Sequence, residues 1–486
     1  MGGHYTEIKD IFNIFFFFFI LVVSIYKNMG KWFGLIALIP GLAMVFLDQS
    51  ILPVALPTMQ KELGASETSL QWCINAYLLT IAVFVLLGGK FSDRVGHRRT
   101  LLIGISLFSV SSILCGVSPN VYFLIAARAL QGTGAALMFP AQTALLAVLF
   151  PPKERGRAMG LNVSMGSFFL IMGPLIGGYC TEHFSWRLIF WINIPIAIVG
   201  FILCLRFLPR TKTVHSLIDL KGFIYFAISC SSAIIAFMQG SDWGWLSYKV
   251  DGLFAISLFS FFLLLRREKK AHHPFLDLTL FKNPVFTSIN ISISIVQFML
   301  MVGVFRVIYF QNVLGYSPSE AGFITFATCI PLLFMSPIGG YLSDKLTPKL
   351  PIAIGFLLII SSFFWLGFNS DPSVTVLFLA LGAYGLGVPL IFTPSYSFAM
   401  STVKPSKRGV AFGMIATLRN FSATLGIAVI GLFMGGGEEK QIQMIRFSTA
   451  HFALGFLLIF AFAVTFILFH RKSTHHLPEA PAEGWD

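Results

Sequence analysis

Long apolar runs recur along the whole chain of 486 residues, and they constrain its fold more than any other feature. Each run has about 18–25 residues, enough for a helix to cross a hydrocarbon core about 30 Å thick. Because lipid offers no hydrogen-bond partner to backbone N–H and C=O groups, such runs must be helical. Only 11% of the residues are charged, and no polar stretch is long enough for a soluble domain. The sequence therefore predicts an all-α polytopic membrane protein.

Fourteen spans are expected, and the basic residues between them indicate their orientation. Alternate loops hold 23 and 5 lysines and arginines. Basic loops stay in the cytoplasm, so we expect a multi-pass inner-membrane protein with a cytoplasmic C-terminus. The net charge of +13 is thus read as a topology signal and not as a nucleic-acid site. The predicted spans are 33–57, 72–91, 100–118, 121–148, 157–180, 187–208, 219–239, 250–266, 286–312, 321–342, 351–369, 374–400, 409–434 and 449–470.

The N-terminal stretch 11–26 is apolar for only 16 residues. It lacks a small-residue cleavage site, so a signal peptide is not expected. Two interpretations stay open: a segment that lies in the membrane interface, or an upstream extension of a chain that would start at Met29.

The two halves of the chain resemble each other. GGKFSDRVGHRR, from Gly88, recurs as GGYLSDKLTPK from Gly339, at an offset of 251 residues. PKERGRAMG, from Pro152, recurs as PSKRGVAFG from Pro405, at an offset of 253 residues. Between them QGTGAALMFP loosely matches YGLGVPLIFTP. Three matches in the same order at a nearly constant offset indicate an internal repeat.

The two spans within 219–266 have no counterpart in the repeat, so the expected architecture is six helices, then two, then six. Repeats about an axis normal to the membrane, with a substrate site between them, are a transporter design. The expected segments are an N-terminal extension (1–31), a first six-helix bundle (32–210), the inserted helices with their linkers (211–285), a second six-helix bundle (286–470) and a cytoplasmic tail (471–486).

The loop after the second span reads GKFSDRVGHRR, residues 89–99. Its glycines permit a tight turn with positive φ, and its aspartate can accept hydrogen bonds from a helix N-terminus or pair with arginine. By itself this pattern fits a tight basic loop that anchors the helix ends. Its candidate functional residues are Gly89, Asp93, Arg94, Gly96, Arg98 and the second-half copy of the aspartate, Asp344.

Two charged residues stand deep inside apolar runs, Asp48 and Arg128. An arginine there costs roughly 2.5–3.5 kcal/mol on insertion scales, so it should face a polar cavity or a partner. Burial favours the neutral form of a carboxyl group, so Asp48 could take up and release a proton. A fixed ion pair between the two is the alternative for Asp48, and a helix–helix clamp is the alternative for Arg128. The second half has no arginine at the matching position, near Leu381, which favours a functional role for Arg128.

The fifth span carries Gly173, Pro174, Gly177 and Gly178. Small residues four apart let helix backbones approach closely, and proline bends the helix. By itself this pattern indicates a tightly packed, bent helix.

With these motifs the chain resembles the major facilitator superfamily, and within it the fourteen-span drug:proton antiporter family, over residues 33–470. The resemblance implies that the 89–99 loop is a gate latch, that Arg128 takes part in proton coupling and that the Gly173–Gly178 stretch is the antiporter signature. The opening stretch 47–57 also resembles the family's first-helix motif. Departures are Phe169 and Pro53, where the family usually has glycine and asparagine.

The second half has two arginines in its apolar runs, Arg306 and Arg419, and no acid there. The family also has an arginine at the position of Arg419, so that residue is open to a structural reading. Arg306 could extend to the outer interface or bind an anionic substrate. The candidate cavity residues are Gln49, Asn75, Tyr77, Gln131, Arg306, Tyr309, Tyr384, Arg419 and Asn420.

The expected function is proton-coupled export of drugs or toxic amphipathic compounds across the inner membrane. The alternatives are export of an anionic metabolite or siderophore, and a lipid flippase or uptake permease of the same fold; a membrane scaffold would not explain Asp48 and Arg128. No nucleophile–base pair, nucleotide loop or metal-ligand spacing is found, including among the six cysteines. We therefore expect no enzyme activity, cofactor or metal. The expected partners are protons, a small substrate and the bilayer, for a monomer with or without a periplasmic adaptor.

Overall fold

The computed structural model describes residues 30–211, 213, 219–270, 276, 278–345, 347–369, 371–403, 408–434 and 440–470. Within these residues, fourteen helical segments are long and apolar enough to cross a membrane. This confirms the predicted all-α fold with fourteen spans. The expectations for residues 1–29 and 471–486 lie outside the described part of the chain.

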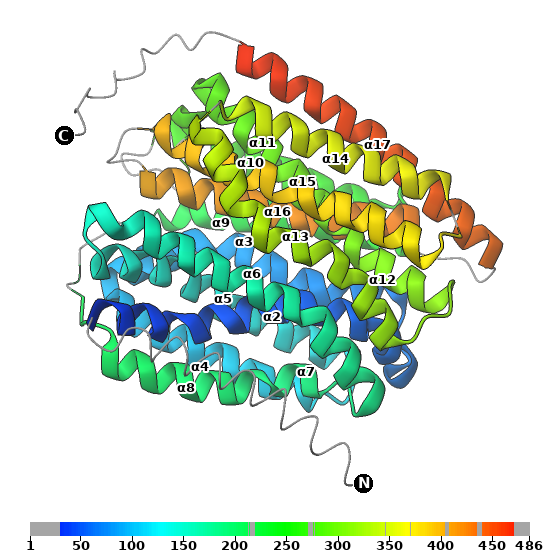
Figure 1. The fold of residues 1–486 in the computed structure, drawn as a ribbon, viewed down its shortest axis with the longest axis horizontal. Coiled ribbons are helices and arrows are strands. Elements are labelled where there is room, and N and C mark those ends of the chain that lie inside the picture. Colours follow the sequence, from blue (N-terminus) through cyan, green and yellow to red (C-terminus); the bar gives the residue numbers. More distant parts are fainter. Residues whose placement is uncertain are drawn as a thin grey trace.

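The helices run roughly side by side along one direction (Figure 1). The first six spans are α2 (Gly30–Leu63), α3 (Glu67–Val95), α4 (His97–Gly116), α5 (Val121–Leu149), α6 (Pro152–His183) and the pair α7 (Leu188–Trp191) and α8 (Asn193–Phe207). The inserted spans are α9 (Leu220–Trp243) and α10 (Tyr248–Lys270), followed by the short 3₁₀-helix η1 (Leu278–Lys282). The last six spans are the pair α11 (Pro284–Leu300) and α12 (Val302–Asn312), then α13 (Pro318–Lys345), α14 (Lys349–Phe368), α15 (Val374–Ser401), α16 (Arg408–Met434) and α17 (Lys440–His470).

Several helices begin before the apolar run that predicted them, because polar residues in the loops cap them. The side chain of Ser66 accepts a hydrogen bond from the backbone N–H of Ser69 in the first turn of α3, which begins at Glu67 instead of residue 72. Asn120 caps α5 in the same way, and that helix begins at Val121 as predicted. Pro152 stands in the first turn of α6, where proline loses no hydrogen bond. Capping satisfies the free N–H groups of the first turn, so a helix is stable outside the hydrocarbon region.

Two spans that were predicted as continuous helices are interrupted in the structure. The sixth is divided between α7 and α8 at Ile192, and the ninth is divided between α11 and α12 at Met301. At the second break the N–H group of Met301 donates to the carbonyl of Phe298, three residues back, at 3.2 Å. This tighter turn interrupts the regular helix without unfolding it.

The internal repeat is visible in the packing. In the first half α2 contacts α6 and α8, α5 contacts α3 and α4, and α4 contacts α8. In the second half α11 contacts α16 and α17, α15 contacts α13 and α14, and α14 contacts α17. Each contact in one half thus has its counterpart in the other, as a duplicated bundle requires.

Among the described residues, the halves meet mainly through three helix pairs, with a smaller contact between α2 and α13. α6 contacts α13, α3 contacts α16, and α2 contacts α12. The first two pairs are related by the repeat. The inserted helices α9 and α10 pack on each other, and α9 also contacts α3 and α16 at the edge of the interface.

Two glycines with positive φ mark the two ends of the bundle. Gly64 has a φ of 57° and joins α2 to α3, whereas Gly96 has a φ of 101° and joins α3 to α4. These ends are called the Gly64 end and the Gly96 end below. The second also holds the ends of α8 and α17 and the start of α2, because the helices alternate in direction.

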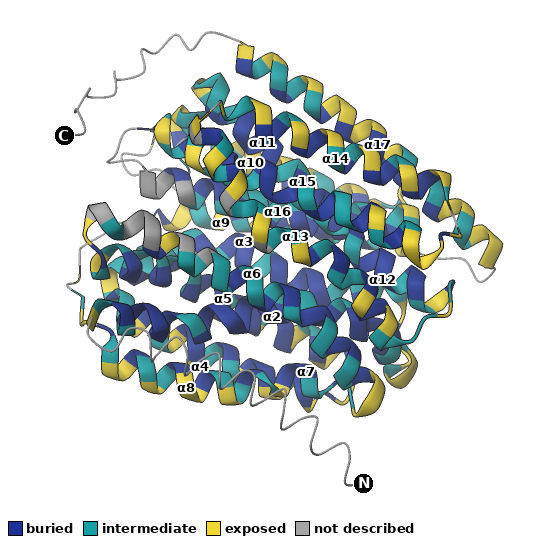
Figure 2. Ribbon diagram, viewed as in Figure 1, coloured by how far each residue is buried: buried dark blue, intermediate teal, exposed yellow. Residues whose placement is uncertain are grey.

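Buried residues follow the faces on which helices meet, and the outward faces of α4, α8 and α17 carry many exposed residues (Figure 2). Large apolar side chains on these outward faces are exposed, for example Val110, Ile202 and Phe460. An exposed apolar surface of this extent marks contact with another apolar phase. It is the surface expected to face lipid.

Candidate functional site

The two charged residues singled out in the apolar runs form an ion pair. Arg128 Nη1 on α5 lies 2.6 Å from Asp48 Oδ2 on α2, and both side chains are at most 1% exposed. Breaking such a pair by removing one partner costs about 3–5 kcal/mol, because the other charge is then left uncompensated.

Gln131 completes this pair, since it bonds to both charged groups. Its Nε2 atom donates to Asp48 Oδ1 at 3.0 Å and to Ser112 Oγ at 2.8 Å, while its Oε1 atom accepts from Arg128 Nη1 at 2.6 Å. Arg128 Nε donates to the carbonyl of Cys73 at 2.9 Å, and the Arg128 guanidinium carbon lies 4.3 Å from the centre of the Tyr77 ring. Both oxygens of Asp48 are therefore bonded, and four helices contribute.

The Gly173–Gly178 motif packs against the helix that carries Asp48. A Cβ atom added at Gly173 would meet Ser50 Oγ at 1.9 Å, and one at Gly177 would meet the carbonyl oxygen of Ile51 at 2.7 Å. Only glycine lets α6 approach α2 this closely, two and three residues after the buried acid.

The same motif also contacts the second half of the chain. A Cβ atom at Gly178 would meet the carbonyl oxygen of Pro318 at 2.6 Å, and one at Gly322 would meet the carbonyl oxygen of Pro174 at 2.3 Å. Helix α6 is thus clamped between α2 and α13, so a shift at Asp48 is coupled by packing to the interface between the halves.

The gate-loop residues lie at the Gly96 end. A Cβ atom added at Gly89 would lie 3.7 Å from Pro140, an ordinary contact distance, so this position does not require glycine for space. Asp93 is half-buried and Arg94 is exposed. Arg98 Nη2 donates to the carbonyl of Leu205 on α8.

Other described hydrogen bonds of this loop join Ser92 to His97 and the backbone N–H of His97 to Thr211 Oγ1, in the linker after the first bundle. None of these bonds reaches the second bundle, and the side chain of Asp344 lies outside the described residues, so the latch between halves stays a prediction.

The second half also contains a fully buried arginine. Arg306 on α12 is 2% exposed, and its Nε atom donates to His451 Nε2 on α17 at 3.0 Å. The interpretation that Arg306 extends to the outer interface is therefore wrong. Packing decides its position, because the guanidinium carbon lies 4.8 Å from the ring centre of Phe363 and 5.2 Å from that of Tyr384. His451 was not among the residues predicted from the sequence, although a lone histidine in an apolar span was a signal.

Three further candidate residues are placed as follows. Asn75 lies away from the ion pair, because its Nδ2 atom donates to Met238 Sδ of the inserted helix α9 at 2.9 Å. Gln49, next to Asp48, is half-buried. The Tyr309 ring stacks on Phe447, with ring centres 4.0 Å apart.

The last two candidates lie next to each other on α16. Arg419 Nη1 is 3.5 Å from the hydroxyl of Tyr396. Asn420 donates to the carbonyl of Ala416 within its own helix, at 2.9 Å.

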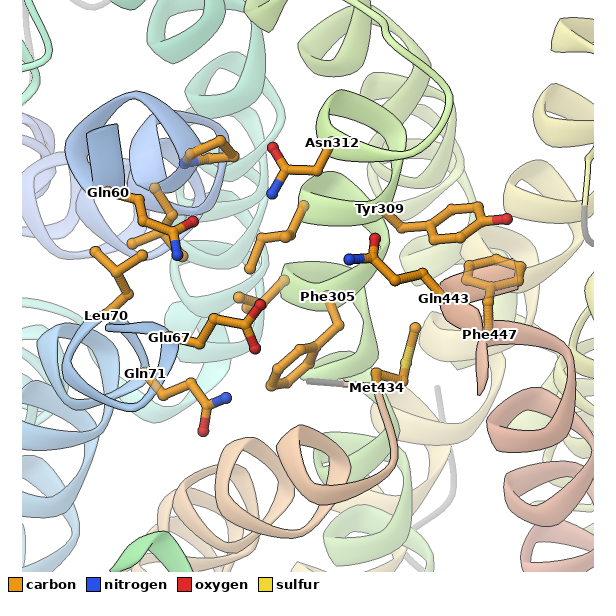
Figure 3. Close-up of a pocket in the computed structure, with 14 residues that line it drawn as sticks. Gln60, Glu67, Leu70, Gln71, Phe305, Tyr309, Asn312, Met434, Gln443 and Phe447 are labelled. Atoms are coloured by element: carbon orange, nitrogen blue, oxygen red, sulfur yellow. The ribbon is translucent and has the colours of Figure 1, made fainter. Parts of the chain in front are cut away.

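A small pocket opens between the halves at the Gly64 end (Figure 3). Its walls come from the end of α2, the start of α3, α12, the end of α16 and the start of α17, and its volume is about 40 Å³. Ligand pockets for small molecules have about 300–1,000 Å³. A substrate would therefore need the helices to move apart here.

Known proteins match this chain over most of its length. The model of the Major Facilitator Superfamily matches residues 38–427, and again residues 287–485. The multidrug resistance protein Stp of Mycobacterium tuberculosis is 32% identical over 420 residues, 86% of this chain and 78% of that protein. The riboflavin transporter RibZ of Clostridioides difficile is 33% identical over 407 residues, 83% of this chain and 88% of that protein.

The fold is also found among solved structures. The xylose transporter XylE from E. coli, in a partially occluded inward open conformation, has a TM-score of 0.63. The similarity covers 91% of this chain and 98% of that one at 15% sequence identity. At this identity the likeness shows the shared fold alone.

Proposed function

Because the chain belongs to the major facilitator superfamily, we propose that it is a proton-coupled secondary transporter that exports drugs or toxic amphipathic compounds across the inner membrane. The observation that carries the proposal is the buried Asp48–Arg128 pair, bridged by Gln131. Burying a carboxylate inside a helical bundle costs free energy, and such a residue is expected in a proton carrier.

The network supplies a chemical route for this coupling. When Asp48 takes up a proton, its charge attraction to Arg128 is lost, but Arg128 keeps its bonds to Gln131 and to the carbonyl of Cys73. Helices α2 and α5 can then separate while the Arg128 guanidinium group keeps hydrogen-bond partners. Because Gly173 and Gly177 pack directly after Asp48 on α2, a shift of this helix is passed to α6 and on to α13.

The direction of transport follows from the proposed orientation. The Gly96 end carries most of the basic residues, so we place it in the cytoplasm, and the Gly64 end faces outward. A proton entering from the Gly64 end is driven inward by about 2.3 kcal/mol per 100 mV of membrane potential. Its release toward the cytoplasm would drive the outward step of the substrate.

The relatives support two classes of substrate. The protein named a multidrug resistance protein supports drugs, and export of several compounds is the first candidate. The protein named a riboflavin transporter is equally similar and supports a second candidate, transport of a metabolite. Both candidates use the same proton site and differ only in what the cavity accepts.

Transport by the purified full chain in liposomes tests the proposal. An imposed pH gradient should drive the movement of at least one of ethidium, chloramphenicol, 2-naphthoate or riboflavin, and the movement should stop in Asp48→Asn. The matched control is Asp251→Asn, which removes an exposed acid at the start of α10 and should transport normally. Transport of none of the four, or gradient-driven transport by Asp48→Asn, would refute proton-coupled export.

A further inference from the structure

Arg306 has no acidic partner among the described residues, in contrast to Arg128. Both guanidinium groups are fully buried, at 2% and 1% exposure. The described ion pairs include Arg128 with Asp48 but none with Arg306. An uncompensated charge in a low-dielectric site is costly, so the position calls for an explanation.

The neighbours of Arg306 are polar but carry no negative charge. His451 Nδ1 lies 2.7 Å from the carbonyl of Phe447 and donates to it, so Nε2 is free to accept from Arg306 Nε. The imidazole is thus in its neutral form in this arrangement. The rings of Phe363 and Tyr384 offer cation–π contacts, which compensate a buried charge only in part.

Two buried polar atoms of this cluster are left without a partner. Arg306 Nη2 and the hydroxyl oxygen of Tyr384 have no hydrogen-bond partner among the described residues. Tyr384 is 2% exposed, so its hydroxyl group is also shielded from solvent. Such atoms are uncommon in proteins, and each calls for an explanation. Together they offer two N–H or O–H donors and one positive charge.

The repeat shows what is missing. Residue 384 corresponds to residue 131 at the offset of 253, and Gln131 is the residue that bridges the acid and the arginine of the first half. The second half thus has an arginine and a donor at the bridging position, but no counterpart of Asp48. We propose that the cluster of Arg306, Tyr384 and His451, here called the anion site, binds the carboxylate of an amphipathic substrate.

The charge balance favours a carboxylate over a phosphate monoester. The cluster has one permanent positive charge and a neutral histidine, so one negative charge compensates it. A phosphate monoester carries about two negative charges at neutral pH and would leave one unpaired. The planar guanidinium group also matches the geometry of a carboxylate, to which it can donate two parallel hydrogen bonds.

The pocket at the Gly64 end lies next to the anion site, and an aromatic pair stands between them. Tyr309 and Phe447 line the pocket and stack on each other, as their adjacent rings in Figure 3 show. The Phe447 ring also packs on His451, with ring centres 4.1 Å apart. This aromatic pair therefore separates the pocket from the anion site, and movement of Phe447 joins them. The apolar part of the substrate would then lie in the pocket.

The inference rests on the proposed function, because it names the substrate class of the same transporter. Equilibrium binding without a gradient tests it separately from proton coupling. The probes are 2-naphthoate, its uncharged amide 2-naphthamide, and 2-naphthyl phosphate, which share one ring system. The purified full chain should bind 2-naphthoate at least about tenfold more tightly than either of the others, as expected for a charge-assisted contact in a buried site.

The variants assign this preference to the anion site. Arg306→Gln should remove the preference for 2-naphthoate, and Arg306→Lys should restore part of it. Tyr384→Phe removes only the hydroxyl group and should weaken 2-naphthoate binding about threefold to tenfold, with 2-naphthamide unchanged. The control Arg266→Gln removes an exposed arginine of α10 and should behave as the wild type.

Three results would overturn the inference: no binding of 2-naphthoate, no preference for it in the wild type, or the same preference in both Arg306→Gln and Tyr384→Phe. Thermal unfolding accompanies each measurement, and Arg306→Gln should not be less stable than the wild type, because it removes an uncompensated charge. If Arg306→Gln does not fold, the binding of 2-naphthoate and 2-naphthamide to Tyr384→Phe tests the anion site. Loss of proton-driven transport in liposomes with charge-selective binding intact would refute proton coupling but not the anion site.

Discussion

Replacing Asp48 with asparagine separates a proton carrier from a structural ion pair. The carboxylate accepts from two donors, Arg128 Nη1 at 2.6 Å and Gln131 Nε2 at 3.0 Å. An amide offers only one acceptor atom, so its NH₂ group must face one of these donors. The substitution keeps the size of the side chain but fixes it in a neutral state, as a permanently protonated acid would be.

The structure sets the magnitude of the loss. A hydrogen bond to a charged group contributes about 1.5–3 kcal/mol, and breaking a buried pair costs about 3–5 kcal/mol. Arg128 keeps Gln131 Oε1 and the carbonyl of Cys73, so we expect the lower end, about 3 kcal/mol, for Asp48→Asn. Arg128→Gln leaves the carboxylate with Gln131 alone and should cost about as much. The double variant has no charge left at this site and should regain about 2 kcal/mol of this.

The assay measures two quantities in the wild type, both single variants and the double variant. One is the free energy of unfolding in detergent, and the other is proton-driven transport in liposomes. A proton carrier predicts that transport stays absent in the double variant although its stability returns, while exchange of substrate down its own gradient persists in Asp48→Asn. If proton-driven transport returns together with stability in the double variant, Asp48 is a structural partner and the coupling mechanism is refuted.

Three further predictions concern the gate, the packing and the topology. Asp93→Asn should slow turnover severalfold while folding and substrate binding stay largely unchanged; transport at the wild-type rate would refute the latch. Gly178→Ala should cost about 1–3 kcal/mol of unfolding free energy, because its Cβ atom meets backbone of α13. The control Gly252→Ala meets nothing within 4 Å and should not lower stability, because alanine is the better helix former; a melting temperature of Gly178→Ala equal to that of the wild type would refute the close approach of α6. Single cysteines in 435–448 should react with an impermeant reagent added outside the cell, and those in 267–282 should not; the opposite labelling would invert the proposed orientation.

The sequence by itself determined the elements and the first half of the site. Lipid leaves helix as the only choice for a long apolar run, so fourteen spans could be predicted from composition and length. For the same reason a charge inside a span is exceptional, which singled out Asp48 and Arg128 before any contact was known. The glycines of α6 also predicted close packing correctly.

Only the tertiary structure decided which side chains meet. The sequence does not show how each helix is rotated about its axis, and that rotation turns Asn75 toward Met238 of the inserted helix α9 and places Gln131 between the two charges. The contact of Arg306 with His451 joins residues 145 positions apart, a pairing that no local pattern encodes. A lone arginine could have extended toward water as easily as into the bundle. Packing against Phe363 of α14 and Tyr384 of α15 settled that choice, because these rings meet Arg306 only in the folded protein.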